Sequence, residues 1–184
     1  MLQDIFFAVW FLLPAALANA SPIIAAKIPA LKKYDAPMDG GRTYRGNRIF
    51  GSHKTWRGMI TGIIVATIVL WIQQILAGQV GWIDELTGGV YAAFPVLLMG
   101  PAFAIGALGG DAIESFFKRG RGIKSGRAWV PFDQLDYIIG SVLLSLFFII
   151  LTPIQYVLIF VIWFVAHFAA SYVGYLLGLK KDPI

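Results

Sequence analysis

One short cluster of the chain sets two carboxylates beside a hydroxyl and an ammonium group. Asp111 and Glu114 are followed by Ser115 and Lys118. If this stretch is helical, a turn of about 100° per residue puts the four side chains on one stripe. The stripe could be only a salt-bridged surface, because Glu114 and Lys118 form a favourable i,i+4 pair. This cluster alone therefore does not decide between a surface and a site.

A second cluster, residues 131–137, carries Asp133 and Asp136 where another helix is expected to begin. Carboxylates at a helix N-terminus can be simple caps, but one would be enough for that purpose. Two on one face, together with the carboxylates that end the preceding apolar segment, form the oxygen-rich kind of site that Mg²⁺ prefers. We therefore predict a metal site made by Asp111, Asp133 and Asp136, with Glu114 as a fourth candidate ligand.

Two further segments carry polar residues that could bind a nucleotide. Residues 51–58 place Lys54 and Thr55 among glycines near a helix N-terminus, where anions are favoured, although the order of a Walker A loop is absent. In the first apolar segment, Asn19 lies close to Pro22, and a proline-broken helix could line a polar cavity. A hydrogen bond from Asn19 to a neighbouring helix would explain that residue equally well.

The elements that hold these residues are expected to lie in a membrane. Hydrophobic residues make up 58% of the 184-residue chain, above the usual 45–50% of soluble domains. A spanning helix needs about 20 apolar residues, and the chain offers such stretches at 5–26, 58–78, 91–110, 136–153 and 156–178. The longest polar stretch, 27–57, is too short to fold alone. We predict an all-α, polytopic protein, with one transmembrane domain over residues 1–184 and about five spans.

Charge placement predicts the orientation of these spans. All 15 Lys and Arg residues fall in the first loop, the third loop and the tail, whereas residues 79–90 carry only Asp84 and Glu85. Because basic loops stay in the cytoplasm, we expect an N-terminus outside a cell membrane, a C-terminus inside, and a polar cavity that faces the cytoplasm. The basic loops could merely set topology and contact anionic lipid. They explain the net charge of +5 without a nucleic acid partner.

Taken together, the clusters resemble the signatures of the membrane-embedded phosphatidate cytidylyltransferases. The C-terminal signature is matched by Gly110-Asp111, Glu114-Ser115, Lys118-Arg119, Gly122-Ile123-Lys124 and Asp133-Gln134-Leu135-Asp136, and the second motif by Lys54-Thr55-Trp56-Arg57-Gly58. The length and the Asp-Gln-Leu-Asp variant resemble most the archaeal branch, the CDP-archaeol synthases, over essentially the whole chain. Ser125 stands where the bacterial enzymes carry an Asp, so their metal ligands do not transfer one for one.

The resemblance implies that CMP is transferred from CTP to an isoprenoid glycerol ether lipid phosphate, 2,3-bis-O-geranylgeranylglycerol 1-phosphate, with Mg²⁺ as cofactor. It implies catalytic roles for Asp111, Asp133, Asp136 and Lys118. The CTP-binding set that follows is Asn19, Pro22, Lys54, Thr55, Ser115, Lys118, Arg119 and Lys124. A phosphate monoester needs no general base, so the protein mainly has to join and neutralise two polyanions. His53 and His167 are accordingly expected to be structural.

Three other functions remain open at this level. The same transfer to an ester lipid phosphate would need no different motif, because apolar tails leave little sequence signal. The run Asp39-Gly40-Gly41-Arg42 faintly resembles the start of the CDP-alcohol phosphotransferase motif, but the rest of that motif is missing. A transporter would need ionisable residues deep in its spans, and apart from His167 the spans have none. The sequence gives no signal for an oligomeric state.

Overall fold

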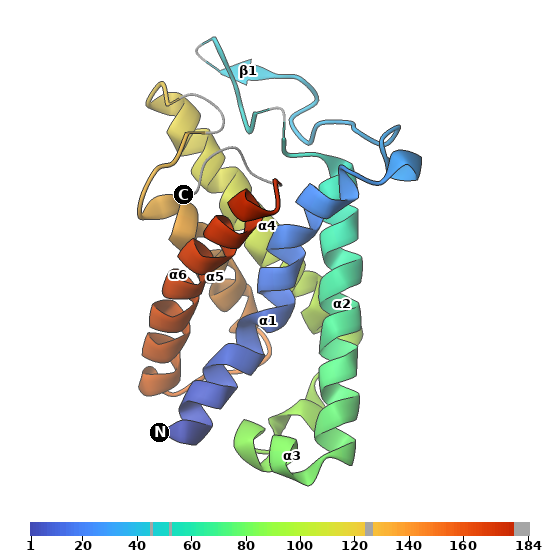
Figure 1. The fold of residues 1–184 in the computed structure, drawn as a ribbon, viewed down its shortest axis with the longest axis vertical. Coiled ribbons are helices and arrows are strands. Elements are labelled where there is room, and N and C mark those ends of the chain that lie inside the picture. The colour runs from blue at the N-terminus through green and yellow to red at the C-terminus, as the bar shows by residue number, and fades with distance from the viewer. Residues whose placement is uncertain (45, 52, 124–126, 179–184) are drawn as a thin grey trace.

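The computed structural model describes residues 1–184 except 45, 52, 124–126 and 179–184, and the described chain is mainly helical (Figure 1). The elements in chain order are α1 (Leu2–Ala25), η1 (Pro29–Leu31), β1 (Thr43–Tyr44), β2 (Asn47–Arg48), α2 (Trp56–Gln79), α3 (Gly81–Thr87), η2 (Val90–Ala93), α4 (Val96–Gly120), α5 (Phe132–Ser145) and α6 (Pro153–Leu176). The two short strands form an antiparallel hairpin in the first loop, which was not predicted. The short helix α3 lies in the second loop and was also not predicted.

Within the described residues, α1, α2, α4 and α6 are long and apolar enough to cross a membrane. A helix of 24 residues is about 36 Å long, more than the hydrocarbon thickness of about 30 Å. The outer face of α2 exposes Ile60, Ile64 and Ile68 at four-residue spacing, as a lipid-facing surface requires. These four helices confirm four of the five expected helical segments.

The expected span 136–153 is helical only in part. Helix α5 ends at Ser145 after 14 residues, a length of about 21 Å, and 146–152 was wrongly predicted as helix. The break is stabilised locally, because Phe148 and Ile149 both donate their backbone N–H to the Ser145 carbonyl. A capping box made by Thr152 then begins α6. The number of membrane crossings, about five, stays a prediction.

The first span is not broken at its prolines. Pro14 and Pro22 both lie inside the continuous helix α1, so the predicted interruption of that helix was wrong. Neighbouring helices allow proline within a membrane helix, because they cover the backbone groups that it frees. Pro22 also packs closely on α2, where a Cβ added at Gly58 would lie 3.1 Å from the Pro22 Cβ. This proline therefore brings α1 and α2 together.

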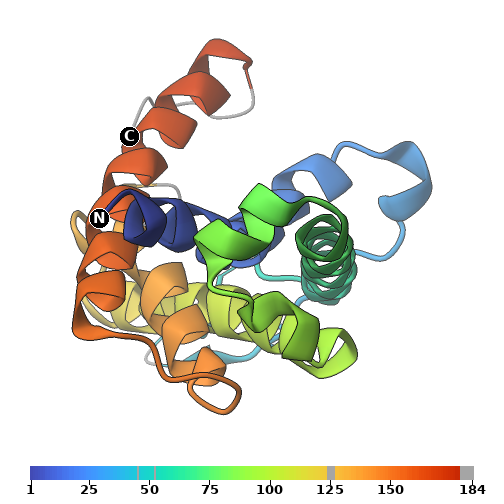
Figure 2. The same ribbon diagram turned by 90° about the horizontal axis from the view of Figure 1, so that it is seen from below.

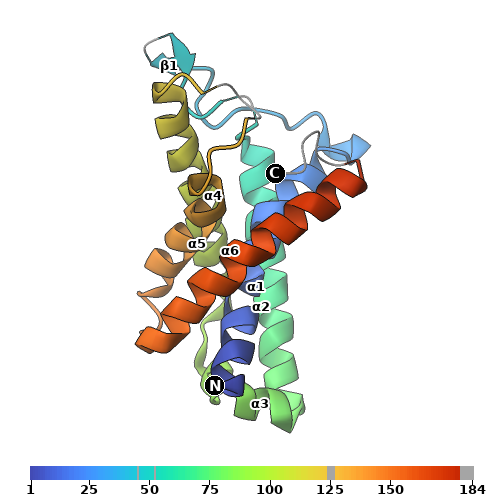
Figure 3. The same ribbon diagram turned by 60° about the vertical axis from the view of Figure 1, so that its left-hand side comes forward.

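Helix α1 forms the centre of the bundle. In Figure 2 it lies between α2 on one side and α6 on the other, and Figure 3 shows α6 running obliquely across it. Its core face buries Phe7, Phe11 and Leu12, and the Phe11 ring meets Phe103 of α4 edge-on at a centroid distance of 5.3 Å. This packing holds the helices whose ends carry the polar clusters.

Helices α4 and α5 touch backbone to backbone. A Cβ added at Gly106 would lie 2.5 Å from the Gly140 carbonyl oxygen, and one added at Gly110 would collide with the carbonyl oxygen of Asp136. Small residues allow this approach between membrane helices, which lack a hydrophobic force to drive them together. Since Asp111 follows Gly110, the contact sets Asp111 and Asp136 side by side.

The close approach predicts a different stability for two neighbouring glycine variants. Gly110→Ala should lower the free energy of unfolding by about 1–3 kcal/mol, because the added methyl group overpacks the α4–α5 contact. Gly109→Ala is the matched control, since its added Cβ meets nothing within 4 Å and alanine favours a helix over glycine. Thermal unfolding in detergent, followed by circular dichroism, measures both. Equal melting temperatures for the two variants would contradict the contact.

Candidate active site

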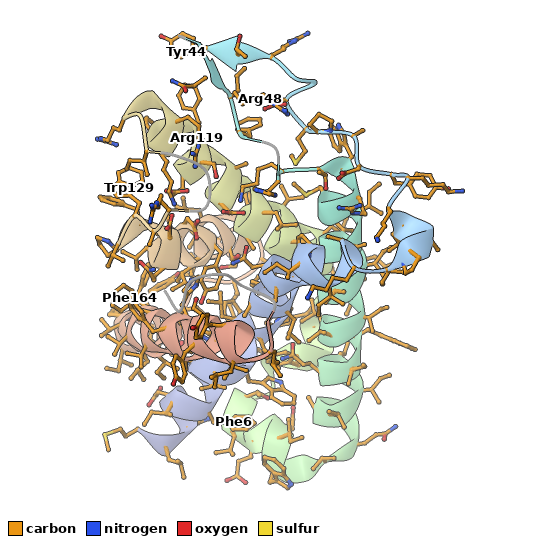
Figure 4. The ribbon with its side chains drawn as sticks, turned by 45° about the horizontal axis from the view of Figure 1, so that its top comes forward. Phe6, Tyr44, Arg48, Arg119, Trp129 and Phe164 are labelled. Atoms are coloured by element: carbon orange, nitrogen blue, oxygen red, sulfur yellow. The ribbon has the colours of Figure 1, made fainter. Side chains whose placement is uncertain are left out.

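A large cavity of about 1180 Å³ opens at the end of the bundle where the first loop lies. Its walls come from α1, α2, α4, α5, α6 and the first loop. It is lined by every described residue that was predicted for the site: Asn19, Pro22, Lys54, Thr55, Asp111, Glu114, Ser115, Lys118, Arg119, Asp133 and Asp136. Lys124 lies outside the described residues. Figure 4 turns this end of the molecule forward and labels Arg119 near it.

A second cavity, of about 180 Å³, lies elsewhere and has a different character. It is lined by residues such as Gln3 and Thr87, and none of its lining residues is ionisable. A phosphate or metal ion would find no charged partner there. Of these two cavities in the described part of the chain, the large one is therefore the one with ionisable lining residues.

Three carboxylates converge in the large cavity. One oxygen from each of Asp111, Glu114 and Asp136 lies within 4.8 Å of the other two. Glu114 is only 8% exposed, and its Oε1 has no hydrogen-bond partner among the described residues. Buried like charges repel and need a cation, and three carboxylate oxygens suit a hard divalent ion. This group therefore has the donor set of a metal site.

Two lysines pair with the carboxylates of the cavity. The Lys54 Nζ lies 2.5 Å from Asp111 Oδ2, whereas the Lys118 Nζ lies 2.5 Å from Asp133 Oδ1 and 3.8 Å from Glu114 Oε1. Burial acts to lower the pKa of Lys54, but the Asp111 carboxylate outweighs it, so this pKa is raised above its ordinary value. Lys54 is thus charged at neutral pH.

Asp133 lies beside the converging carboxylates rather than among them. Its Oδ1 accepts from Lys118, and its Oδ2 accepts from the backbone N–H of Trp129 at 2.7 Å. The sequence ranked Asp133 above Glu114 as a ligand, but it is Glu114 that the structure groups with Asp111 and Asp136. Glu114 lies close to Asp111 because the two residues are three apart on α4 and therefore share one face of that helix. The role of Asp133 as a ligand stays a prediction.

The first loop is held in place by an ion pair between the buried Asp39 and the partly exposed Arg48, which was not predicted. Asp39, whose side chain is fully buried, accepts from the Arg48 guanidinium at 2.6 Å and from the backbone N–H groups of Gly41 and Phe50. The hydrogen bond from Arg48 lowers the pKa of Asp39 to about 2. The oxygens of Asp39 therefore stabilise the first loop. The Asp-Gly-Gly-Arg run could have suggested a catalytic carboxylate instead.

The other predicted phosphate-binding residues have local roles in the fold as well. The Thr55 hydroxyl accepts from the Gly58 N–H at 3.2 Å and caps α2. Arg119 donates from Nη1 to the Ile123 carbonyl at 2.5 Å, and Ser115 is buried in the cavity wall. Their contacts with a nucleotide stay predictions, because these hydrogen bonds are internal to the protein.

Several cavity residues were missed by sequence reasoning. His53 and His167, expected to be structural, both line the cavity, as do Lys27, Lys32, Arg57 and Arg127. The His167 ring lies 5.8 Å from the ring of Tyr137, the residue that follows Asp136. An ionisable residue in an otherwise apolar span is a signal that could have indicated His167.

Comparison with known proteins assigns a family to this architecture. The model of the CDP-archaeol synthase family matches residues 1–184. The CDP-archaeol synthase of Thermococcus kodakarensis is 32% identical over 183 residues, which cover 99% of this chain and 98% of that protein. The one of Methanospirillum hungatei is 35% identical over 181 residues, 94% of this chain and 99% of that protein.

A solved structure agrees with this result. It is an intramembrane enzyme for archaeal membrane lipid biosynthesis, and it superposes with a TM-score of 0.70 at 29% sequence identity, over 89% of this chain and 92% of that one. The resemblance seen in the motifs is thereby confirmed over the whole length of the protein. The chain belongs to the CDP-archaeol synthase family.

Proposed function

We propose that this protein transfers the CMP moiety of CTP to 2,3-bis-O-geranylgeranylglycerol 1-phosphate, giving a CDP-activated lipid and pyrophosphate. Family membership supports this reaction class, and the name of its relatives favours an archaeal ether lipid over an ester lipid. The observation that carries the proposal is the meeting of three carboxylates and two lysines in one cavity at the end of a membrane bundle. The whole chain acts as one transmembrane domain.

The reaction asks the protein to bring two anions together. The lipid phosphate ionises with a second pKa of about 6, so its oxygen attacks the α-phosphorus of CTP without a general base. A new P–O bond forms, and the bond to the β-phosphate breaks to release pyrophosphate. Positioning and charge neutralisation supply most of the catalysis in such transfers. Lys54, Lys118 and Arg119 are the described cations that we assign to the phosphates of CTP.

Asp111, Glu114 and Asp136 would hold the metal ion, for which Mg²⁺ is our proposal, with Asp133 as a fourth ligand. When bound, Mg²⁺ neutralises phosphate charge and makes the phosphorus more electrophilic. The Oε1 of Glu114 supports this assignment, because this buried oxygen accepts no hydrogen bond in the described chain and its nearest cation, the Lys118 Nζ, is 3.8 Å away. Asn19 and Pro22, on α1, are proposed to lie nearer the nucleoside.

We further propose that the cavity faces the cytoplasm and that the N-terminus lies outside. The first loop and the first turn of α2, which together hold eight of the 15 basic residues, are at the cavity end of the bundle, whereas α3 lies at the opposite end with the N-terminus (Figure 1). Basic loops are retained in the cytoplasm. In this orientation, CTP from the cytoplasm can enter the cavity and reach the carboxylates directly.

The reaction is tested by incubating the purified protein with labelled CTP, Mg²⁺ and either the ether-linked or an ester-linked lipid phosphate. We expect CDP-lipid and pyrophosphate in equal amounts with the ether lipid. Nucleotide release without a CDP-lipid product would contradict a cytidylyltransferase. A higher kcat/KM with the ester lipid would instead reassign the acceptor.

The carboxylate assignment predicts selective loss of activity. Asp111→Asn and Asp136→Asn should each lower kcat by more than about 100-fold, which exceeds the usual effect of losing a residue that only supports a metal ligand. Asp136→Asn, which breaks no ion pair seen in the described chain, should change the melting temperature little. Asp35→Asn is the matched control, because Asp35 lines the same cavity but pairs with Arg57 and is 64% exposed. It should retain near wild-type turnover. Near wild-type turnover in Asp136→Asn across a Mg²⁺ titration would remove Asp136 from the ligands.

The orientation can be tested with single cysteines, because the chain has none of its own. Cysteines at Arg42 and Asp84 should react with an impermeant thiol reagent from opposite faces of the membrane. In intact cells only the Asp84 position should be labelled, and lysis should expose the Arg42 position. Labelling of both from one face would exclude the proposed topology.

A further inference from the structure

The carboxylates of the cavity already have cationic partners in the protein itself. Among the described residues, Lys54 and Lys118 are the cations that lie within 4 Å of Asp111, Glu114 or Asp133. Both ion pairs are partly buried, since the Lys118 side chain is 8% exposed and the Lys54 side chain 21%, with Asp133 at 22% and Asp111 at 24%. They cannot be treated as loose surface contacts.

A metal ion and these lysines compete for the same negative charge. A divalent ion bound by Asp111 and Glu114 would repel the adjacent ammonium groups, and the repulsion is strong where water is excluded. A buried lysine that loses its carboxylate needs a new anion. The phosphates of CTP provide that anion, because we have assigned both lysines to them.

We propose that Lys54 and Lys118 are exchangeable counter-ions, which neutralise the carboxylates before the metal binds and pass to the phosphates of CTP when metal and nucleotide enter. The proposal rests on the proposed function and adds how its charges are balanced.

The exchange gives Lys54 opposite effects on the two ligands. Without Lys54, a metal ion has no competitor at Asp111 and should bind more tightly, while CTP loses a phosphate contact and should bind more weakly. If Lys54 only supports the fold, its removal should weaken the binding of both the metal and CTP. If Lys54 only binds phosphate, its removal should weaken the binding of CTP and leave the metal affinity unchanged. The sign of the change in metal affinity therefore separates the three roles.

Binding of Mn²⁺ to the full chain in detergent, without nucleotide, is the first measurement. Lys54→Met should lower the Mn²⁺ Kd at least about tenfold, whereas Lys54→Arg, which keeps the charge, should stay near wild type. Arg57→Met is the matched control, because Arg57 lines the same cavity but pairs with Asp35 at 3.2 Å. Calorimetry with CTP at saturating Mg²⁺ should show a Kd at least about tenfold higher for Lys54→Met.

The wild-type protein provides a second measurement that does not depend on the folding of a variant. Acetylation of Lys54 by a small amine-reactive acetylating reagent can be quantified by mass spectrometry. It should increase when Mn²⁺ is added and decrease again when CTP follows. Unchanged acetylation on adding Mn²⁺, or an Mn²⁺ Kd in Lys54→Met that is equal to or higher than wild type, would overturn the exchange alone. Failure of the wild type to bind Mn²⁺ would overturn the proposed metal site and the exchange together.

Discussion

The backbone contact between α4 and α5 is the constraint on which the site depends. Gly106, Gly110 and Gly140 let the two helices approach until backbone meets backbone. The same short segment carries Asp111 on one helix and Asp136 on the other, so the packing contact and the carboxylate group form one structure. Lipid tails are as apolar as the helix surfaces, and the approach must therefore come from small residues rather than from hydrophobic burial.

Gathering carboxylates at a membrane helix end is unfavourable unless cations accompany them. Lys118 comes from α4 itself, but Lys54 comes from the first loop, and that loop needs its own support. The Asp39–Arg48 pair supplies it, together with backbone hydrogen bonds from Met38 to Lys54 and from Trp56 to Ala36. Because the pKa of Asp39 is lowered to about 2, this support is complete at neutral pH and is lost only as the pH falls below about 4.

Most of the fold could be predicted from the sequence, as could the gathering of the candidate site residues in one cavity. Long apolar stretches placed α1, α2, α4 and α6, and the three-residue spacing of Asp111 and Glu114 put both on one face of α4. The grouping of Glu114, rather than Asp133, with Asp111 and Asp136 could not be predicted, because it depends on how α5 is turned against α4. The end of α5 at Ser145 was missed because the following residues are as apolar as a spanning helix.

The buried role of Asp39 was hidden for a similar reason. Its partner Arg48 is nine residues away, and only the folded hairpin joins them. Pairing over such a distance has no periodic signature, unlike a helical face. The cavity residues that were overlooked, His53 and His167, likewise become neighbours of the carboxylates only through the packing of separate elements.

The proposed metal site is made by Asp111, Glu114 and Asp136, and it gives up its lysine partner when the metal binds. Anomalous diffraction from crystals grown with Mn²⁺ and CTP tests this most directly, because it locates the metal without any assumption about its ligands. We expect an anomalous peak in contact with carboxylate oxygens of all three residues, with the Lys54 ammonium on a phosphate rather than on Asp111. A peak held by other carboxylates, or one at this site with the Lys54–Asp111 pair intact, would contradict it.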